Sequence, residues 1–228
     1  MLRFIHSRLI QALFSIQRIP ETPPPLKAEH IDGAQLLVNR EALLRELPVG
    51  GTVMECGVDE GLFSRQILEI TKPHKLLLVD LWGDRRFNTD KLMKIQSDLS
   101  SQIESGQVQI ERQTSVEALE ACEDGSLDWI YIDTDHSYST TQSELKLAAQ
   151  KVKASGYICG HDYTIGSWPS YHRYGVIEAV NRFCVEQNWK FAYLTHEPNR
   201  NLSFALTSAA FSTDNAIGDE KRERHERR

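Results

Sequence analysis

Short apolar runs rich in β-branched residues alternate with longer helical patterns through the middle of the chain. The expected strands are Thr52–Cys56, Lys75–Leu81, Val108–Arg112, Leu127–Asp133, Tyr157–Gly160, Lys190–Leu194 and Leu202–Thr207. The expected helices between the first five strands are Leu62–Thr71, Thr89–Glu104, Val116–Glu123 and Ser139–Ala154. Such alternation is typical of βαβ units and predicts a mainly parallel sheet covered by helices on both faces.

The flanks of this pattern complete the predicted fold. Apolar positions over Ala34–Leu47 indicate an amphipathic helix that ends at Pro48. A short polar loop, His196–Asn201, joins the last two strands, which should pair antiparallel at one edge. The fold class is therefore α/β, Rossmann-like and doubly wound, with a mainly parallel seven-stranded sheet and an antiparallel edge strand. In such sheets ligands bind beyond the carboxyl ends of the strands.

Both ends of the chain differ from this domain, which is expected to span residues 34–211. Residues 1–33 combine a helical apolar pattern, interrupted by arginines, with the Pro20–Pro25 linker. The pattern favours a helix that packs on its own domain or on a partner subunit in a homo-oligomer, with membrane contact as the alternative. It does not read as a secretory signal. Residues 212–228 are mostly charged and predict a disordered tail.

Composition narrows the possible partners and the compartment. Of 228 residues, 26 are Lys or Arg and 32 are Asp or Glu, which gives a net charge of −6 and argues against nucleic acid as a partner. The four cysteines form no CxxC pair, so a zinc knuckle is not expected. We expect the protein to be located in the reducing cytoplasm. No apolar run approaches the roughly 20 residues of a membrane span.

The loop after the first strand distinguishes between two classes of cofactor. Gly57 and Gly61 form a GxxxG turn, which lets the backbone turn sharply against a ligand. Dinucleotide sites usually carry GxGxxG and a helix N-terminus for the pyrophosphate. Asp59 and Glu60 lie in this loop, and Glu55 precedes it in the sequence. These carboxylates would repel a pyrophosphate but attract the sulfonium and ammonium of S-adenosylmethionine. A purely structural turn remains the alternative.

Two further strand ends are expected to contact an adenosine. Asp80 follows the second strand, 23 positions after Gly57, where a carboxylate can accept both ribose hydroxyls; helix capping is the alternative. After the third strand, Ser115 is expected near the adenine, and its hydroxyl is expected to cap the following helix.

Acidic and imidazole side chains follow the fourth and fifth strands. The residues are Asp133, Asp135, His136, His161 and Asp162. Asp133 and Asp162 could supply oxygen ligands to a divalent cation, Mg²⁺ being the first choice, whereas binding by His161 would shift the preference to softer metals. His136 is the candidate general base for a hydroxyl. Loop capping by mutual hydrogen bonds is the alternative.

These motifs resemble a known family over Val53 to about Leu206. The runs ECGVDEGLFS, LVDLW, IDTDHSY and GHDYTIGSWPSYHRYGVIEAV are similar to class I methyltransferases, in the branch of macrolide sugar O-methyltransferases of the macrocin and mycinamicin type and cephalosporin hydroxylase-like proteins. IDTDHSY also resembles the fourth-strand motif of caffeoyl-CoA and catechol O-methyltransferases. The resemblance implies that Asp133 and Asp162 bind a metal and that His136 stands at the position of the base. His161 departs from the acidic or amide residue of the family.

The expected function is transfer of a methyl group from S-adenosylmethionine to a hydroxyl of a sugar, natural product or phenol, with a divalent metal and a histidine base. Residues 163–174 would form an aromatic loop over the acceptor. The alternatives are a non-methylating relative, hydroxylase-like or purely binding, and an oxidoreductase of the NAD type.

Overall fold

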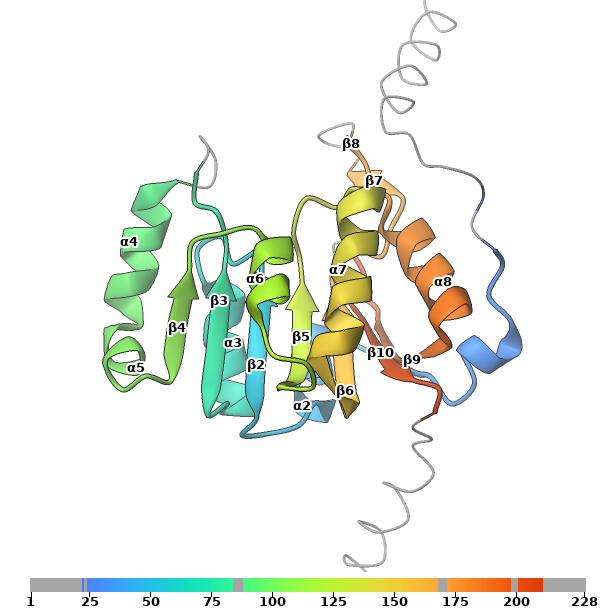
Figure 1. Cartoon of the computed structure of the whole chain (residues 1–228), viewed down its shortest axis with the longest axis horizontal. Helices are drawn as coiled ribbons and strands as arrows, with labels where there is room; N and C mark the ends of the chain where they lie inside the picture. Colours follow the sequence, from blue (N-terminus) through green and yellow to red (C-terminus); the bar gives the residue numbers. More distant parts are fainter. Residues whose placement is uncertain (1–21, 23, 84–87, 168–171, 198–200, 211–228) are drawn as a thin grey trace, which may run out of the picture.

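The computed structural model describes residues 22, 24–83, 88–167, 172–197 and 201–210. Its main sheet has eight strands in the order β1-β9-β10-β6-β5-β2-β3-β4. The strands are β1 (Gln35–Leu37), β2 (Thr52–Cys56), β3 (Lys75–Val79), β4 (Val108–Glu111), β5 (Leu127–Ile132), β6 (Val152–Gly160), β9 (Trp189–Thr195) and β10 (Phe204–Ser208). A two-stranded hairpin, β7 (Gly166–Ser167) with β8 (His172–Arg173), stands apart from it. Figure 1 shows this hairpin at the end of the sheet to which β3, β4 and β5 point.

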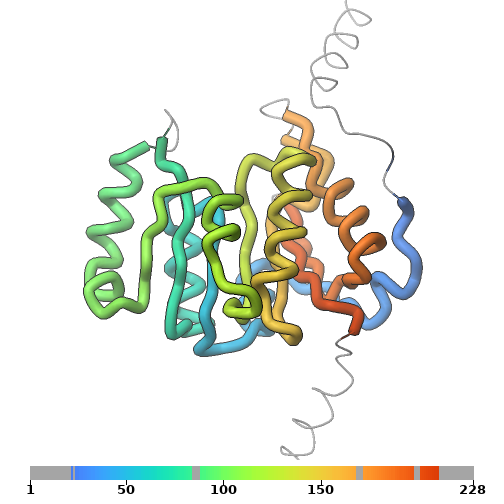
Figure 2. The backbone as a smooth tube through the Cα atoms, viewed as in Figure 1, coloured from blue at the N-terminus to red at the C-terminus, as the bar shows by residue number. Residues whose placement is uncertain are grey.

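Helices cover both faces of the sheet, as predicted. They are η1 (Ala28–His30), α2 (Arg40–Glu46), α3 (Leu62–Thr71), α4 (Thr89–Asp98), α5 (Ser100–Glu104), α6 (Ser115–Ala121), α7 (Tyr138–Lys151) and α8 (Val176–Gln187). Side chains of α2, α3 and α4 pack with one face of the sheet, and those of α6, α7 and α8 pack with the other. The tube in Figure 2 shows these two helical layers with the sheet between them. The doubly wound α/β class is therefore confirmed.

The strand order places a switch in direction beside β2. From β2 the chain proceeds to β3 and β4 on one side, and it then crosses back to β5 and β6 on the other. The parallel pairs β2 with β3 and β2 with β5 put the carboxyl ends of these strands at the same edge. This edge is where doubly wound folds bind ligands.

The sheet departs from prediction at its outer edge. Gln35–Leu37 forms β1, which pairs parallel with β9, so the sheet gains an eighth strand where a helix was expected. The helix begins only at Arg40, because the Asn39 side chain accepts a hydrogen bond from the Ala42 amide at 2.8 Å and caps it. Strand β10 is antiparallel to β9 as predicted, but it lies between β9 and β6 rather than at the edge.

Two helices differ from their predicted bounds, and one helix was not predicted. The expected helix Thr89–Glu104 divides into α4 and α5 at Leu99, which has non-helical backbone angles. The helix expected to reach Ala154 ends at Lys151, and β6 begins directly at Val152. Helix α8 was not predicted, although its buried face repeats with helical spacing.

The predicted N-terminal helix and the charged tail lie outside the described residues, as do Trp168, Pro169 and Tyr171 of the predicted aromatic loop. Across the described ranges, no helix combines the length and apolar character that crossing a membrane requires.

Candidate active site

The candidate site lies at the carboxyl ends of β3, β2, β5 and β6, which are neighbours in that order. The residues that follow these strands are the ones predicted to carry the chemistry. Backbone hydrogen bonds tie the four ends together: Gly57 N donates to Val79 O at 2.9 Å and Asp133 N donates to Cys56 O at 2.8 Å. The backbone segments that carry the predicted site residues are therefore held together by hydrogen bonds.

Gly57 is required by the close approach of two strand ends. Its φ is +88°, and a Cβ placed there would lie 1.8 Å from the carbonyl oxygen of Asp133. We expected a ligand in the space beside Gly57, but the backbone that follows β5 fills it. Gly61 has a φ of +71° and precedes the first residue of α3. Both glycines are thus needed for the turn itself.

Asp80 holds this turn in place. One of its carboxylate oxygens accepts hydrogen bonds from the amides of Val58 at 2.9 Å and Asp59 at 3.0 Å. The other accepts from the Trp82 amide at 3.1 Å. A carboxylate has about four lone-pair sites, so at least one acceptor position stays open for a ligand hydroxyl. Asp80 therefore has a structural role that the sequence reasoning did not assign to it.

The acidic loop is less negative than its sequence suggests. Lys91 of α4 forms ion pairs with both Asp59 and Glu60, the latter at 3.3 Å. The two carboxylates are half exposed, at 49% and 43%. Their attraction for a cationic ligand is therefore partly cancelled by a cation 32 residues away, which loop spacing alone does not reveal.

Glu55 is the buried acid of the site. Its side chain on β2 is 2% exposed and accepts a hydrogen bond from the Ser64 hydroxyl. Burial raises the pKa of Glu55 to about 8, and the negative charges of Asp133 and Asp80 act in the same direction. In the free protein this carboxyl is therefore mainly protonated at neutral pH. The mutual influence of Glu55, Asp133 and Asp80 places them around one region.

His136 joins the ends of β5 and β6. Its Nε2 lies 3.1 Å from Asp133 Oδ1 and 2.8 Å from Asp162 Oδ2. Burial lowers the pKa of His136, but the hydrogen bonds and charges of the two carboxylates outweigh burial and raise it to about 10. Conversely, His136 outweighs burial at Asp162 and lowers the pKa of that carboxyl. The free protein thus holds an imidazolium between two carboxylates.

The backbone at this cluster is strained. His136 has a φ of +60° and Asp162 a φ of +58°, values uncommon for residues with a Cβ. Such conformations cost on the order of 1–3 kcal/mol each and gather at functional sites. Asp162 Oδ1 is also buried without a hydrogen-bond partner, although His161 Nε2 lies 3.9 Å from it. Both features favour a ligand-binding role over loop capping.

His161 lies beside this cluster but has a different partner. Its Nδ1 is 3.0 Å from the Ser203 hydroxyl, and its Nε2 is 3.9 Å from Asp162 Oδ1. Among the described residues, the group with ligand atoms within 4.8 Å of one another is Asp133, His136 and Asp162. The structure therefore brings together two of the three predicted metal ligands, with His136 in the place expected for His161.

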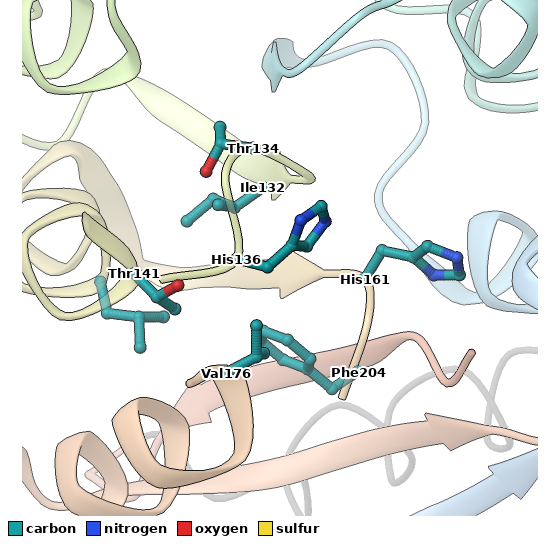
Figure 3. A pocket seen from close by; sticks show the side chains of 8 residues that line it. Ile132, Thr134, His136, Thr141, His161, Val176 and Phe204 are labelled. Atoms are coloured by element: carbon teal, nitrogen blue, oxygen red, sulfur yellow. The ribbon is translucent and has the colours of Figure 1, made fainter. Parts of the chain in front are cut away.

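A small pocket opens beside the two histidines. It measures about 260 Å³ including its opening to solvent. Its walls come from β5, α7, α8 and β10, and they are mostly apolar. Figure 3 shows His136 and His161 at this pocket, with Phe204 and Val176 opposite and the hydroxyls of Thr134 and Thr141 to one side.

The predicted aromatic loop contributes one described ring to the cluster. Tyr174 stacks on His136 with ring centroids 4.5 Å apart and an interplanar angle of 27°. The Gly175 amide donates to His136 O at 2.8 Å, which fixes this approach. Tyr174 belongs to the predicted aromatic loop, and its partner could not be predicted from spacing because 38 positions separate the two residues.

Ser115 faces the interior rather than the predicted ligand side. Its hydroxyl donates to Glu144 of α7, which also accepts from Thr134 at 2.8 Å. The helix cap is Thr114, not Ser115, because α6 starts at Ser115, one residue earlier than the predicted start at Val116. Glu144 is fully buried. The sequence pattern did not indicate this, because a single acidic residue within a predicted helix is expected to be exposed to solvent. Glu144 connects the loops that follow β4 and β5.

Comparison with known proteins gives one family match and a large group of similar folds. Residues 54–163 match the family described as a methyltransferase domain. No curated protein matches the sequence. A SAM dependent methyltransferase from Aquifex aeolicus has a TM-score of 0.55 and 13% identity, over 86% of this chain and 97% of the other.

Two further structures show the same fold. SMU.1697c from Streptococcus mutans, solved in complex with SAH, has a TM-score of 0.53 and 11% identity over 73% of this chain and 94% of the other. An rRNA methylase from Streptococcus thermophilus has a TM-score of 0.54 and 12% identity over 74% and 93%. The sequence match over residues 54–163 and the similar folds agree that this part of the chain resembles a methyltransferase domain of the Rossmann-like α/β fold.

Proposed function

We propose that the protein transfers the methyl group of S-adenosylmethionine to a hydroxyl oxygen of a small molecule. The observation that carries this proposal is the position of His136 between Asp133 and Asp162, at 3.1 and 2.8 Å, beside the strand switch. Transfer to a hydroxyl requires that a proton leave the acceptor, and an imidazole held by carboxylates is suited to receive it. The macrolide-type O-methyltransferase branch remains the expected relationship.

The charges of the cleft suit this methyl donor. S-adenosylmethionine carries a sulfonium and an ammonium but no phosphate, and the cleft gathers Glu55, Asp80, Asp133 and Asp162. A bound cation would favour the ionised form of Glu55, whose pKa burial raises to about 8. Asp80 keeps acceptor capacity for a ribose hydroxyl while it holds the loop. A dinucleotide pyrophosphate would meet repulsion from the same groups.

His136 can accept a proton only when its two carboxylate partners are engaged elsewhere. In the free protein they keep it protonated, because they raise its pKa to about 10 against the effect of burial. A ligand that binds to Asp133 or Asp162 removes part of this stabilisation and lowers the pKa of His136 towards neutral pH. The stacked ring of Tyr174 then fixes the plane of the imidazole for proton transfer.

A divalent cation fits the same residues. Asp162 Oδ1 is buried without a hydrogen-bond partner, and Asp133, His136 and Asp162 offer ligand atoms within 4.8 Å of one another. Asp133 and Asp162 would hold the ion, and the oxygen donors suit Mg²⁺ best. When bound there, the cation would supply a positive charge that lowers the pKa of a coordinated hydroxyl.

The acceptor would enter beside the pocket lined by His136 and His161. The enclosed part of this pocket has room for about one water molecule, so the acceptor ring would lie outside it and only a small substituent would reach in. The apolar wall at Phe204 and the hydroxyls of Thr134 and Thr141 suit the two faces of a sugar or a phenol.

The test is methyl transfer with labelled S-adenosylmethionine, with and without Mg²⁺, across a panel of sugars and phenols. Label in an ether product is the expected result. Binding of S-adenosylmethionine without turnover on any acceptor would favour a non-methylating relative, and binding of NADH in its place would contradict the proposal. Full turnover in excess chelator would remove the metal role from Asp133 and Asp162.

A further inference from the structure

Arg40 is a half-buried cation at the start of α2. It is the first residue of α2, whose start is capped by Asn39 and which is held against α3 by the hydrogen bond from Gln66 to Glu41 at 3.2 Å. The Arg40 guanidinium carbon lies 4.7 Å from the centroid of the Phe63 ring. A cation over an aromatic face is stabilised, so the side chain has a defined position.

The Phe63 ring that contacts this guanidinium also packs against β5. The residue precedes Ser64, which hydrogen-bonds to Glu55, and its ring centroid lies 4.4 Å from that of Tyr131 on β5. The charge of Arg40 opposes the burial that raises the pKa of Glu55. Arg40 is therefore within electrostatic reach of the acid on β2.

Within the described part of the chain, Arg40 forms no ion pair. The other cations near the cleft are already engaged: Lys91 with Asp59 and Glu60, and His136 with two carboxylates. Arg45, on the same helix, pairs with Glu41 at 3.5 Å, and its side chain is 61% exposed. Arg40 thus differs from Arg45 in having no carboxylate within ion-pair distance among the described residues.

The methyl donor has a group that the acidic cleft does not accommodate. Its methionine end carries a carboxylate beside the ammonium, and the acids that attract the ammonium and the sulfonium repel this carboxylate. A carboxylate that leaves water needs a cationic partner to offset the cost of desolvation. Arginine is suited to this task because its planar fork can donate two parallel hydrogen bonds to a carboxylate.

We propose that Arg40 binds the α-carboxylate of S-adenosylmethionine through its guanidinium, stacked on Phe63. This inference rests on the proposed function, because it assumes that donor. The ammonium and sulfonium then face the acids that follow β2 and β5, and the carboxylate faces α2. The role is one of binding and orientation, and Arg40 takes no part in proton transfer.

The experiment is calorimetric titration of two ligands into wild-type protein, Arg40→Gln and Arg45→Gln. S-adenosylhomocysteine carries the carboxylate, and 5′-methylthioadenosine lacks the whole amino-acid portion. A hydrogen-bonded charge pair predicts that Arg40→Gln weakens S-adenosylhomocysteine binding about 10- to 100-fold and leaves methylthioadenosine binding unchanged. Arg45→Gln should bind both ligands as the wild type does, and Arg40→Lys should recover part of the loss.

The outcomes separate this inference from the proposed function. Equal weakening of both ligands by Arg40→Gln would overturn it, because the effect would then be on the adenosine site or the fold. Unchanged affinity for S-adenosylhomocysteine, with a raised KM for the acceptor, would overturn it by assigning Arg40 to the acceptor. Failure of the wild-type protein to bind S-adenosylhomocysteine would contradict the proposed function itself. Thermal unfolding of each variant confirms that the titrated protein is folded.

Discussion

Glu55 is a carboxyl group placed where burial opposes its ionisation, and replacing it by glutamine should separate stability from ligand binding. The side chain is 2% exposed, and burial raises its pKa from 4.5 to about 8. Above pH 4.5 the unfolded chain releases this proton while the folded chain keeps it. Stability due to this group is therefore fully present below pH 4.5 and is lost as the pH rises through 8.

The expected magnitude follows from the size of the shift. Each pKa unit corresponds to about 1.4 kcal/mol. At pH 7.5, ionisation of Glu55 therefore stabilises the unfolded state of the wild type by about 3 to 4 kcal/mol, and Glu55→Gln lacks this effect. The variant keeps an oxygen that accepts from Ser64. We expect Glu55→Gln to be more stable than the wild type by that amount at pH 7.5, and by less than about 1 kcal/mol at pH 5.

Urea unfolding followed by fluorescence of the buried Trp82 and Trp129 measures this difference at each pH. Glu69→Gln, an exposed position on the same helix as Ser64, is the matched control and should leave the pH dependence unchanged. The reasoning would be refuted if Glu55→Gln followed the wild-type pH dependence, or if it were the less stable protein at pH 7.5. Weaker binding of S-adenosylhomocysteine by the more stable variant would show that the buried acid serves the ligand.

Three other changes test separate parts of the site. The raised pKa of His136 stabilises the folded wild type fully below pH 6.5, and this stabilisation, on the order of 2–4 kcal/mol, is lost as the pH rises through 10. His136→Gln should therefore lack this decrease in the free energy of unfolding between pH 6.5 and 10. The same pH dependence as the wild type in urea unfolding would contradict the prediction. Asp80→Ala should weaken S-adenosylhomocysteine binding at least 10-fold, since the loop amides and the ribose both lose an acceptor; unchanged affinity in calorimetry would exclude that role. Glu144→Leu leaves the Ser115 and Thr134 hydroxyls unpaired and should cost about 2–4 kcal/mol in urea unfolding, and an unchanged midpoint would show that those hydroxyls find other partners.

The alternating pattern was enough to predict the fold class because each parallel strand is a nearly continuous apolar run. The β2, β3 and β5 runs were located to within a residue or two at each end. The edge strand Gln35–Leu37 was read as helix because its pairing with β9 depends on residues more than 150 positions away. Local spacing carries no signal for such a contact.

The site was predictable only where chemistry follows directly from a strand end. Asp133 and Asp162 were expected together, since neighbouring parallel strands deliver their ends to the same edge. In the cluster His136 takes the place expected for His161, and it does so with a positive φ, which the sequence pattern does not predict. The pairing of Lys91 with Asp59 likewise depends on how α4 packs against the loop, which the sequence pattern does not specify.

The central claim is that one cleft, bounded by Glu55, Asp80 and His136, holds the methyl donor. A crystal structure of the complex with S-adenosylhomocysteine tests it most directly. The account predicts the ribose at Asp80, the amino-acid end between Glu55 and α2, and the sulfur facing Asp133 and His136. A ligand bound away from these strand ends, or with its sulfur turned away from His136, would contradict it.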